Sequence, residues 1–249
     1  VREVDLMGTQ PEKKTSVFLL LTVSLLLVGS SLVWLRLSKE IMTTSSGAQP
    51  FYNGRTGQKV VALMFNVDWG EEYLPSILEI LKENQVVASF MLTGRWAKLQ
   101  PDLVRRIAVE GHEIGNHSYS HCHPNQLGRS ELEEEIQRTQ AVISEITGKP
   151  PQVFAPPYGE YNQRVLDTAS TLGMPVIMWT LDTIDWRRPS ASTIVERVTV
   201  RVQPDCLILM HPTEPTVQAL PHILTFLKEE GYNLVTVSDI IVEGGRANQ

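Results

Sequence analysis

Histidines with metal-binding spacing gather in one stretch of this sequence. Four of the chain's six histidines fall between residues 112 and 123. His117 and His121 are four residues apart, the separation at which one helical turn points two imidazoles the same way. Two imidazole nitrogens on one side of a turn supply half of a tetrahedral site for a divalent metal. Histidine pairs also arise by chance, so the other polar residues of the chain decide whether this pair indicates a metal site.

Asp68 is the carboxylate best placed to complete a metal site with this pair. A catalytic zinc-type site takes about three protein ligands and leaves one position for water. The metal would polarise a substrate carbonyl and acidify the bound water, so that hydroxide becomes available near neutral pH. We therefore expect one divalent metal at Asp68, His117 and His121, with zinc favoured and cobalt, nickel or manganese as alternatives. On turn chemistry alone, Asp68 could instead form a turn before Gly70.

Hydrolysis also needs a group that protonates the leaving group, and His211 suits that role because histidine exchanges protons near neutral pH. Asp185 or Asp182 would hold the tautomer of its imidazole and favour the charged form. These parts together describe hydrolysis of an amide or ester by metal-bound water. The alternatives are structural: Asp182 caps a turn, Asp185 pairs with a surface arginine, or His211 only fills a loop.

Aromatic side chains near these residues would suit a sugar substrate. Trp69, Tyr158 and Trp186 either belong to the core or stack on sugar rings, and with Asp182 they make the expected substrate-binding set. We assign the other three histidines to structural positions and both cysteines to free thiols. A net charge of -6 without a lysine- and arginine-rich block argues against nucleic-acid binding. The absence of Walker, G-x-G-x-x-G and G-x-S-x-G motifs argues against nucleotide binding and a serine hydrolase.

Strands and helices alternate after residue 59, which sets the positions of these side chains. Residues 60–65 form a continuous apolar run, as expected of a strand buried on both faces of a parallel sheet. Further strands are expected at 86–92, 112–115, 152–154, 175–179, 206–210 and 233–237. Helices are expected at 72–82, 101–109, 130–147, 162–172, 191–202 and 217–230, and Ser130 and Glu133 form a capping-box signature.

Seven strand–helix steps predict an α/β fold, a distorted parallel (β/α) barrel of about seven strands. An open, doubly wound sheet has the same local pattern. In a barrel, functional side chains lie where strands end. Asp68, His117, Tyr158, Asp182 and His211 each follow a different expected strand. This coincidence is the strongest argument that they share one site.

Residues 17–35 run for nineteen positions without a charge, nearly enough for a helix to cross the roughly 30 Å core of a bilayer. Signal-peptide cores usually run about 7–15 residues and end in a small-residue cleavage site, so we favour an uncleaved anchor over a cleaved signal. We expect a tail at 1–16, a transmembrane anchor at 17–37, a linker at 38–58, the domain at 59–241 and a C-terminal tail at 242–249. The protein would be a single-pass cell-membrane protein with its domain outside the cytoplasm.

Three motifs occur together: H-[S/T]-x-x-H at 117–121, D-x-x-D-W at 182–186 and L-x-H at 209–211. With them, residues 59–241 resemble the polysaccharide deacetylase family, the NodB-homology or carbohydrate esterase family 4 domain, and most of all its membrane-anchored, sporulation-associated members. The resemblance implies a distorted (β/α) barrel and metal-dependent removal of N-acetyl groups from peptidoglycan or chitin-like polymers. It makes His211 the catalytic acid, tuned by Asp185.

Two further motifs depart from the family pattern. The usual T-F-D-D-G reads M-F-N-V-D-W-G at residues 64–70, so Asn66 aligns with the catalytic base. The metal-binding aspartate aligns with Val67, unless the loop is one residue longer and Asp68 takes that place. The usual R-x-P-[Y/F]-G reads A-P-P-Y-G at residues 155–159, so Ala155 replaces the arginine that braces the base.

These departures leave three alternatives for function. Asp68 binds the metal and hydroxide attacks without a dedicated base, or Asp68 is itself the base and the metal relies on two histidines plus water. In the third, the protein binds cell-wall glycan without hydrolysing it. General-base assistance is worth about 10²–10⁴-fold, so its loss slows metal-driven attack without abolishing it. On that ground we favour a deacetylase over a binding protein.

Overall fold

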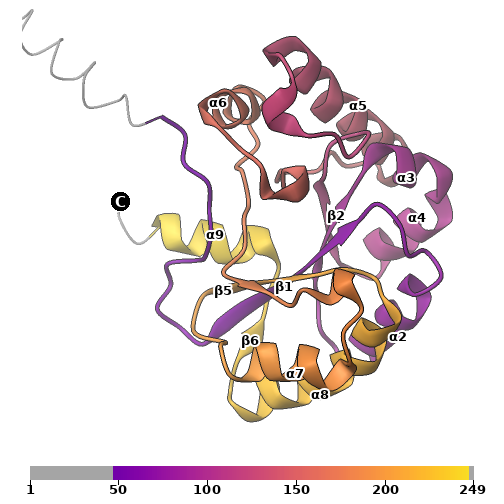
Figure 1. The fold of residues 1–249 in the computed structure, drawn as a ribbon, viewed down its shortest axis with the longest axis vertical. Helices are drawn as coiled ribbons and strands as arrows, with labels where there is room; N and C mark the ends of the chain where they lie inside the picture. Colours follow the sequence, from indigo (N-terminus) through magenta and orange to yellow (C-terminus); the bar gives the residue numbers. More distant parts are fainter. Residues whose placement is uncertain (1–46, 247–249) are drawn as a thin grey trace, which may run out of the picture. The chain divides into compact units, whose positions relative to one another are not determined.

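A buried parallel strand, β1 (Val60–Val67), runs through the centre of the described domain (Figure 1). The computed structural model describes residues 47–246. Its sheet has the order β3-β2-β1-β5-β4, with β6 also paired to β1, and every pair is parallel. The other strands are β2 (Ser89–Leu92), β3 (Glu113–Asn116), β4 (Leu181–Asp182), β5 (Cys206–Met210) and β6 (Asn233–Leu234). The prediction of an α/β fold with a parallel sheet is confirmed.

Single-residue bridges continue the sheet beyond β3. Asn116 bridges Phe154, and Phe154 bridges Val176. The chain from Val176 runs on into β4, which pairs with β5, so the pairings lead from one edge of the sheet round to the other. The described residues hold six strands rather than about seven, since the expected strands at 152–154 and 175–179 form only bridges. Prolines at 150, 151, 156, 157 and 175 bound these segments, and proline has no N–H to give a longer ladder.

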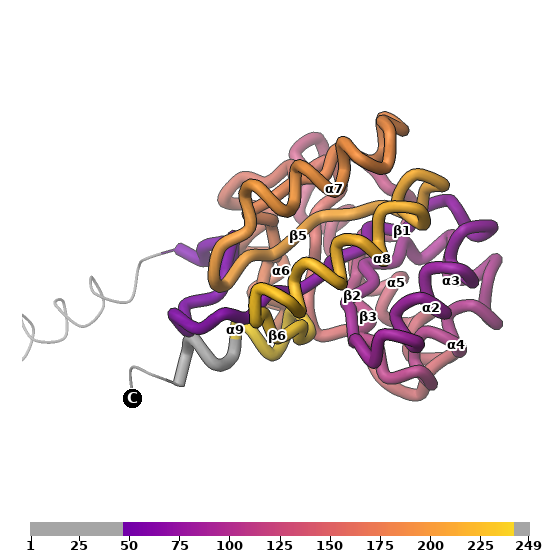
Figure 2. Tube along the Cα trace, turned by 90° about the horizontal axis from the view of Figure 1, so that it is seen from below, coloured from indigo at the N-terminus to yellow at the C-terminus, as the bar shows by residue number. Residues whose placement is uncertain are grey.

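Helices cover the sheet between the strands. They are α2 (Leu74–Glu83), α3 (Gly94–Leu99), α4 (Pro101–Val109), α5 (Arg129–Thr147), α6 (Gln163–Thr171), α7 (Ala191–Thr199), α8 (Glu214–Glu229) and α9 (Val237–Arg246). Short 3₁₀ turns lie at η1 (Pro124–Gln126), η2 (Pro157–Gly159) and η3 (Asp185–Arg187). Helices α7 and α8 run side by side (Figure 2). The sequence did not predict α3 or α9, and the predicted strand 233–237 ends early because α9 begins at Val237.

The N-terminal cap of α5 differs from its prediction. The helix begins after Gly128, whose N–H donates to the Glu131 carboxylate at 2.7 Å. Gly128 has no side chain to accept a hydrogen bond in return, so only the Glu131 half of a capping box forms, two residues before the predicted Ser130 and Glu133. Glu133 instead pairs with Arg129 along the helix surface.

The side chains of β1 divide between two cores. Val61, Leu63 and Phe65 pack with the apolar faces of the outer helices, whereas Ala62 and Met64 point to the opposite face of the sheet. This alternation is the two-residue period of a strand. Because both faces are covered, β1 is apolar along most of its length and becomes polar only at Asn66, near its carboxyl end.

Part of the expected linker lies against the domain. Phe51 bridges Ile177, and Thr56 and the Gly57 N–H donate to the Asp205 carboxylate. None of the helices within residues 47–246 is long and apolar enough to cross a membrane. The expected anchor at 17–37 lies outside the described residues.

Candidate functional site

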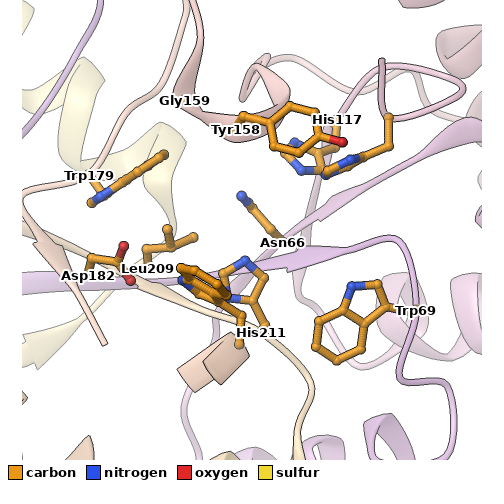
Figure 3. Close-up of a pocket in the computed structure, with 11 residues that line it drawn as sticks. Asn66, Trp69, His117, Tyr158, Gly159, Trp179, Asp182, Leu209 and His211 are labelled. Carbon is orange, nitrogen blue, oxygen red and sulfur yellow. The ribbon is translucent and has the colours of Figure 1, made fainter. Parts of the chain in front are cut away.

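A cavity of about 430 Å³ opens at the carboxyl ends of the strands (Figure 3). It brings together seven of the nine predicted site residues: His117, His121, His211, Tyr158, Asp182, Trp69 and Trp186. Asp185 lies behind His211, and Asp68 lies outside the lining. The lining also contains Asn66, Gly159, Trp179 and Leu209. The strand-end argument therefore located the site, and the roles of its residues stay predictions.

The His117–His121 pair lies on a loop, not on the helical turn that its spacing suggested. Ser118 and His121 adopt left-handed backbone angles, with φ of 66° and 56°. The two rings nevertheless meet edge to face, with centroids 5.0 Å apart. The two histidines come together without a helical turn, because β3 runs directly into this loop and groups from outside the loop hold its backbone.

His117 is held with one ring nitrogen free. Its Nδ1 lies 2.7 Å from the Ala155 carbonyl oxygen and must donate to it, which leaves Nε2 as an unprotonated acceptor. Burial, with a smaller effect from His121, lowers the pKa of His117 to about 3. The imidazole is therefore neutral at pH 7, the form that binds metals.

Glu135 on α5 holds the backbone of residues 117–121, which we call the histidine loop. Sequence reasoning missed Glu135. Its carboxylate accepts the N–H groups of Tyr119 and Ser120 and the hydroxyls of Ser118 and Ser120 at 2.7–3.0 Å. Burial alone would raise the pKa of Glu135, but the hydrogen bonds from Ser120 and Ser118 lower it below its usual value. One carboxylate thus replaces the hydrogen bonds that a helix would have supplied.

We expect Glu135→Gln to destabilise the domain by about 1–2 kcal/mol at pH 7, because an amide replaces a charged acceptor. A lowered pKa in the folded state gives stability above the unfolded value of 4.5 and loses it as the pH falls through the folded value. The difference in unfolding free energy between parent and variant should therefore shrink below about pH 4.5. Urea unfolding at pH 7 and pH 4 measures this, and Glu134→Gln on the exposed face of α5 is the matched control. An equal difference at both pH values would contradict the role given to the carboxylate.

Asp68 is bound by Arg95 and Thr93. Arg95 Nε lies 2.9 Å from Oδ1 and Nη2 lies 2.5 Å from Oδ2, a two-pronged ion pair. The Thr93 hydroxyl donates to Oδ1 at 2.7 Å. Burial lowers the pKa of His121. The Asp68 charge acts to raise this pKa and the Arg95 charge to lower it, so both charges act on His121.

The residues present fit a divalent metal only in part. His117 offers a free nitrogen beside His121, as a metal site requires. The Asp68 carboxylate is taken by Arg95, and within the described residues no three His, Cys, Asp or Glu side chains come close enough to hold an ion. The three-ligand set expected from the sequence is therefore not assembled in this arrangement.

His211 is fixed by a buried carboxylate. Asp185, with a side chain 0% exposed, accepts the His211 N–H at 2.7 Å and lies 2.8 Å from His211 Nδ1. The Thr216 hydroxyl of α8 donates to the same carboxylate at 2.7 Å, and no sequence motif pointed to this partner. The structural alternative of a surface pair for Asp185 is excluded. The His211 ring lies parallel to Trp69, with centroids 6.2 Å apart.

Asn66 projects from β1 into the cavity between Tyr158 and His211 (Figure 3). Asn66 is 8% exposed, and its side-chain Oδ1 has no hydrogen-bond partner. A buried amide oxygen without a partner is costly, so the protein itself does not satisfy the hydrogen-bonding capacity of this side chain. Ala155 does not line the cavity; it is buried, and its methyl group packs into the core on the inner face of the sheet and offers no charge.

The comparisons with known proteins agree with this arrangement. A family model described as polysaccharide deacetylase matches residues 53–177. The chain belongs to the polysaccharide deacetylase family. A peptidoglycan-N-acetylglucosamine deacetylase of Bacillus cereus is 36% identical over 191 residues, which cover 75% of this chain and 70% of that protein. The uncharacterized protein YlxY of Bacillus subtilis is 39% identical over 85% of this chain, although the match spans only 66% of YlxY.

One solved relative is described as a pseudoenzyme. The structure of a CE4 family pseudoenzyme from Bacillus anthracis is 41% identical, with a TM-score of 0.75, and covers 77% of this chain and 68% of its own. A mutant of that pseudoenzyme, described as having restored enzymatic activity, matches with 39% identity and a TM-score of 0.76 over 77% of this chain and 71% of its own. The family thus contains both peptidoglycan deacetylases and a protein that lacks the activity.

Proposed function

We propose that this domain binds N-acetylated glycan of the cell wall and hydrolyses it little or not at all. The observation that carries the proposal is Asn66, which motif alignment assigns to the catalytic base and which presents an amide to the cavity. An amide does not accept a proton near neutral pH, so water in the cavity would lack a general base. Ala155 in place of a bracing arginine and the Arg95–Asp68 pair support the same reading.

The cavity keeps what glycan binding needs. Tyr158, Trp186 and Trp69 stay partly exposed, at 55%, 47% and 38%, and lie at its rim. Flat, exposed rings with a polar neighbour such as Asp182 suit a sugar, which presents apolar C–H faces and hydroxyl edges. The peptidoglycan deacetylases among the relatives support an N-acetylated amino sugar as the ligand.

A slow deacetylase is the second candidate, and one observation favours it. The His211–Asp185 pair keeps the geometry of a general acid with its orienting carboxylate, which a pure binding protein does not need. Loss of base assistance alone reduces a rate by about 10²–10⁴-fold without removing it. Acetate release from an N-acetylated chitooligosaccharide, measured with the full chain at saturating zinc or cobalt, separates the two. Turnover at the rate of the Bacillus cereus enzyme, assayed in parallel, would refute the proposal.

We expect Trp186→Ala to weaken glycan affinity about tenfold, the equivalent of about 1.4 kcal/mol for one lost stacking surface. Titration calorimetry with a chitooligosaccharide measures it. Tyr52→Ala is the matched control, because Tyr52 is 44% exposed and lies outside the cavity. Affinity should also be unchanged by a chelator. An unchanged affinity in Trp186→Ala would place the glycan elsewhere.

We further propose that the chain acts at the cell envelope, anchored in the cell membrane by residues 17–37 with the domain on the outer side. The uncharged run of nineteen residues supports the anchor, and the resemblance to sporulation-associated deacetylases supports a role in the spore wall. Protease accessibility of the domain in intact cells tests the orientation.

A further inference from the structure

We propose that Arg95 is a built-in counter-cation for Asp68 that suppresses divalent-metal binding at the His117–His121 pair. The inference concerns this ion pair and does not depend on which glycan the domain binds. Three features of the structure carry it: where Arg95 is anchored, how it engages Asp68, and what it leaves to the histidines.

The first residues of α3 are hydrogen-bonded to the histidine loop. The N–H groups of Gly94 and Arg95 donate to the carbonyl oxygens of Ser118 and Tyr119, each at 3.0 Å. A side chain at Gly94 would collide with the Tyr119 ring, so glycine permits this close approach. The Arg95 backbone is thus fixed beside the loop that carries both histidines.

From that anchor the Arg95 guanidinium reaches across to the β1–α2 loop. It donates to both carboxylate oxygens of Asp68, and the Thr93 hydroxyl donates a further hydrogen bond to Oδ1. The Asp68 side chain is only 11% exposed, so its charge is poorly screened by water and needs a partner. The hydrogen bond to Asp68 also raises the pKa of Arg95, which keeps the guanidinium charged.

The Arg95–Asp68 ion pair would oppose the binding of a divalent cation to the two histidines in two ways. The cation would need the carboxylate that Arg95 holds, and it would sit near a fixed positive charge that repels it. Half of the Arg95 side chain is exposed, at 51%, so its removal leaves no hole in the core. The ion pair is therefore a specific obstacle that a single substitution can remove.

The test is a cobalt titration of the full chain, followed by the visible absorption of bound Co²⁺, which reports the number of ligands independently of turnover. Arg95→Gln should bind Co²⁺ about 10–100-fold more tightly than the parent, because the substitution frees the Asp68 carboxylate and removes a positive charge beside the histidines. The size is that of other groups that contact a metal ligand, with the opposite sign because Arg95 withholds the ligand. Arg95→Lys keeps the charge and should gain much less. Arg105→Gln removes an exposed arginine that pairs with Asp102 and should change nothing.

The double variant Arg95→Gln/Asp68→Asn identifies the ligand, because removal of the carboxylate should cancel the gain. Equal Co²⁺ affinity in the parent and Arg95→Gln would overturn the proposal. So would a gain that survives in the double variant. Failure of glycan binding would leave these outcomes untouched, since the titration contains no glycan.

Discussion

The Asn66→Asp/Ala155→Arg variant is expected to release acetate from an N-acetylated glycan about 10²–10⁴-fold faster than the parent, the usual value of a general base. Asn66 already lines the cavity, and its buried Oδ1 has no hydrogen-bond partner. A carboxylate at this position could accept a proton from water attacking an acetyl group. The arginine at 155 would then supply the positive charge that holds the new carboxylate ionised.

Acetate release is measured at saturating zinc or cobalt, so that weak metal affinity does not limit the rate. Asn66→Asp alone should gain less than the double variant, because a buried carboxylate without a partner keeps its proton more tightly. Asn66→Ser is the matched control, a polar side chain that is no base. A mutant of the related pseudoenzyme from Bacillus anthracis is described as having restored enzymatic activity, so a protein of this fold can regain activity by mutation. A folded double variant that binds glycan yet releases no acetate would contradict the assignment of Asn66 to the base position.

The sequence predicted best those elements whose own residues determine them. Strand β5 and helix α4 lie at their predicted positions because a fully apolar run and a proline-initiated amphipathic stretch are local signals. Helix α3 gave no comparable signal, since it is only 6 residues long and a single residue, Gln100, separates it from α4. Helix α9 contains Gly244 and Gly245, which weaken helical propensity and hide it from a sequence pattern.

The site divides in the same way. Residues that directly follow strands could be predicted to meet, because parallel strands end at one side of the sheet. Arg95, Glu135 and Thr216 could not, since each lies on a helix and approaches the site only through tertiary packing. These three determine whether Asp68 is free, how the histidine loop bends and how Asp185 is held. Motif spacing therefore located the site. Which of its groups are free to bind or react depends on tertiary contacts that motif spacing does not reveal.

Asp185→Ala is expected to lower the unfolding free energy by about 3–5 kcal/mol, the usual cost of breaking a fully buried charged network by removing one partner. Asp185 accepts three hydrogen bonds, from the His211 N–H, the His211 ring and Thr216. Its loss leaves the Thr216 hydroxyl, at a fully buried residue, without its acceptor, and frees a ring that lines the cavity. Urea unfolding followed by tryptophan fluorescence measures the change at pH 7.

Two further variants separate the network from a general effect of losing a carboxylate. Thr216→Val removes one hydrogen bond to the charged group and should cost about 1.5–3 kcal/mol. Asp102→Ala removes a carboxylate that is 96% exposed and pairs only with Arg105, and it should change stability by less than about 0.5 kcal/mol. If Asp185→Ala behaved like Asp102→Ala, the carboxylate would not be what fixes His211. In that case the resemblance of this pair to a general acid and its orienting partner would be geometric only, and the slow-deacetylase candidate would lose the observation that favours it.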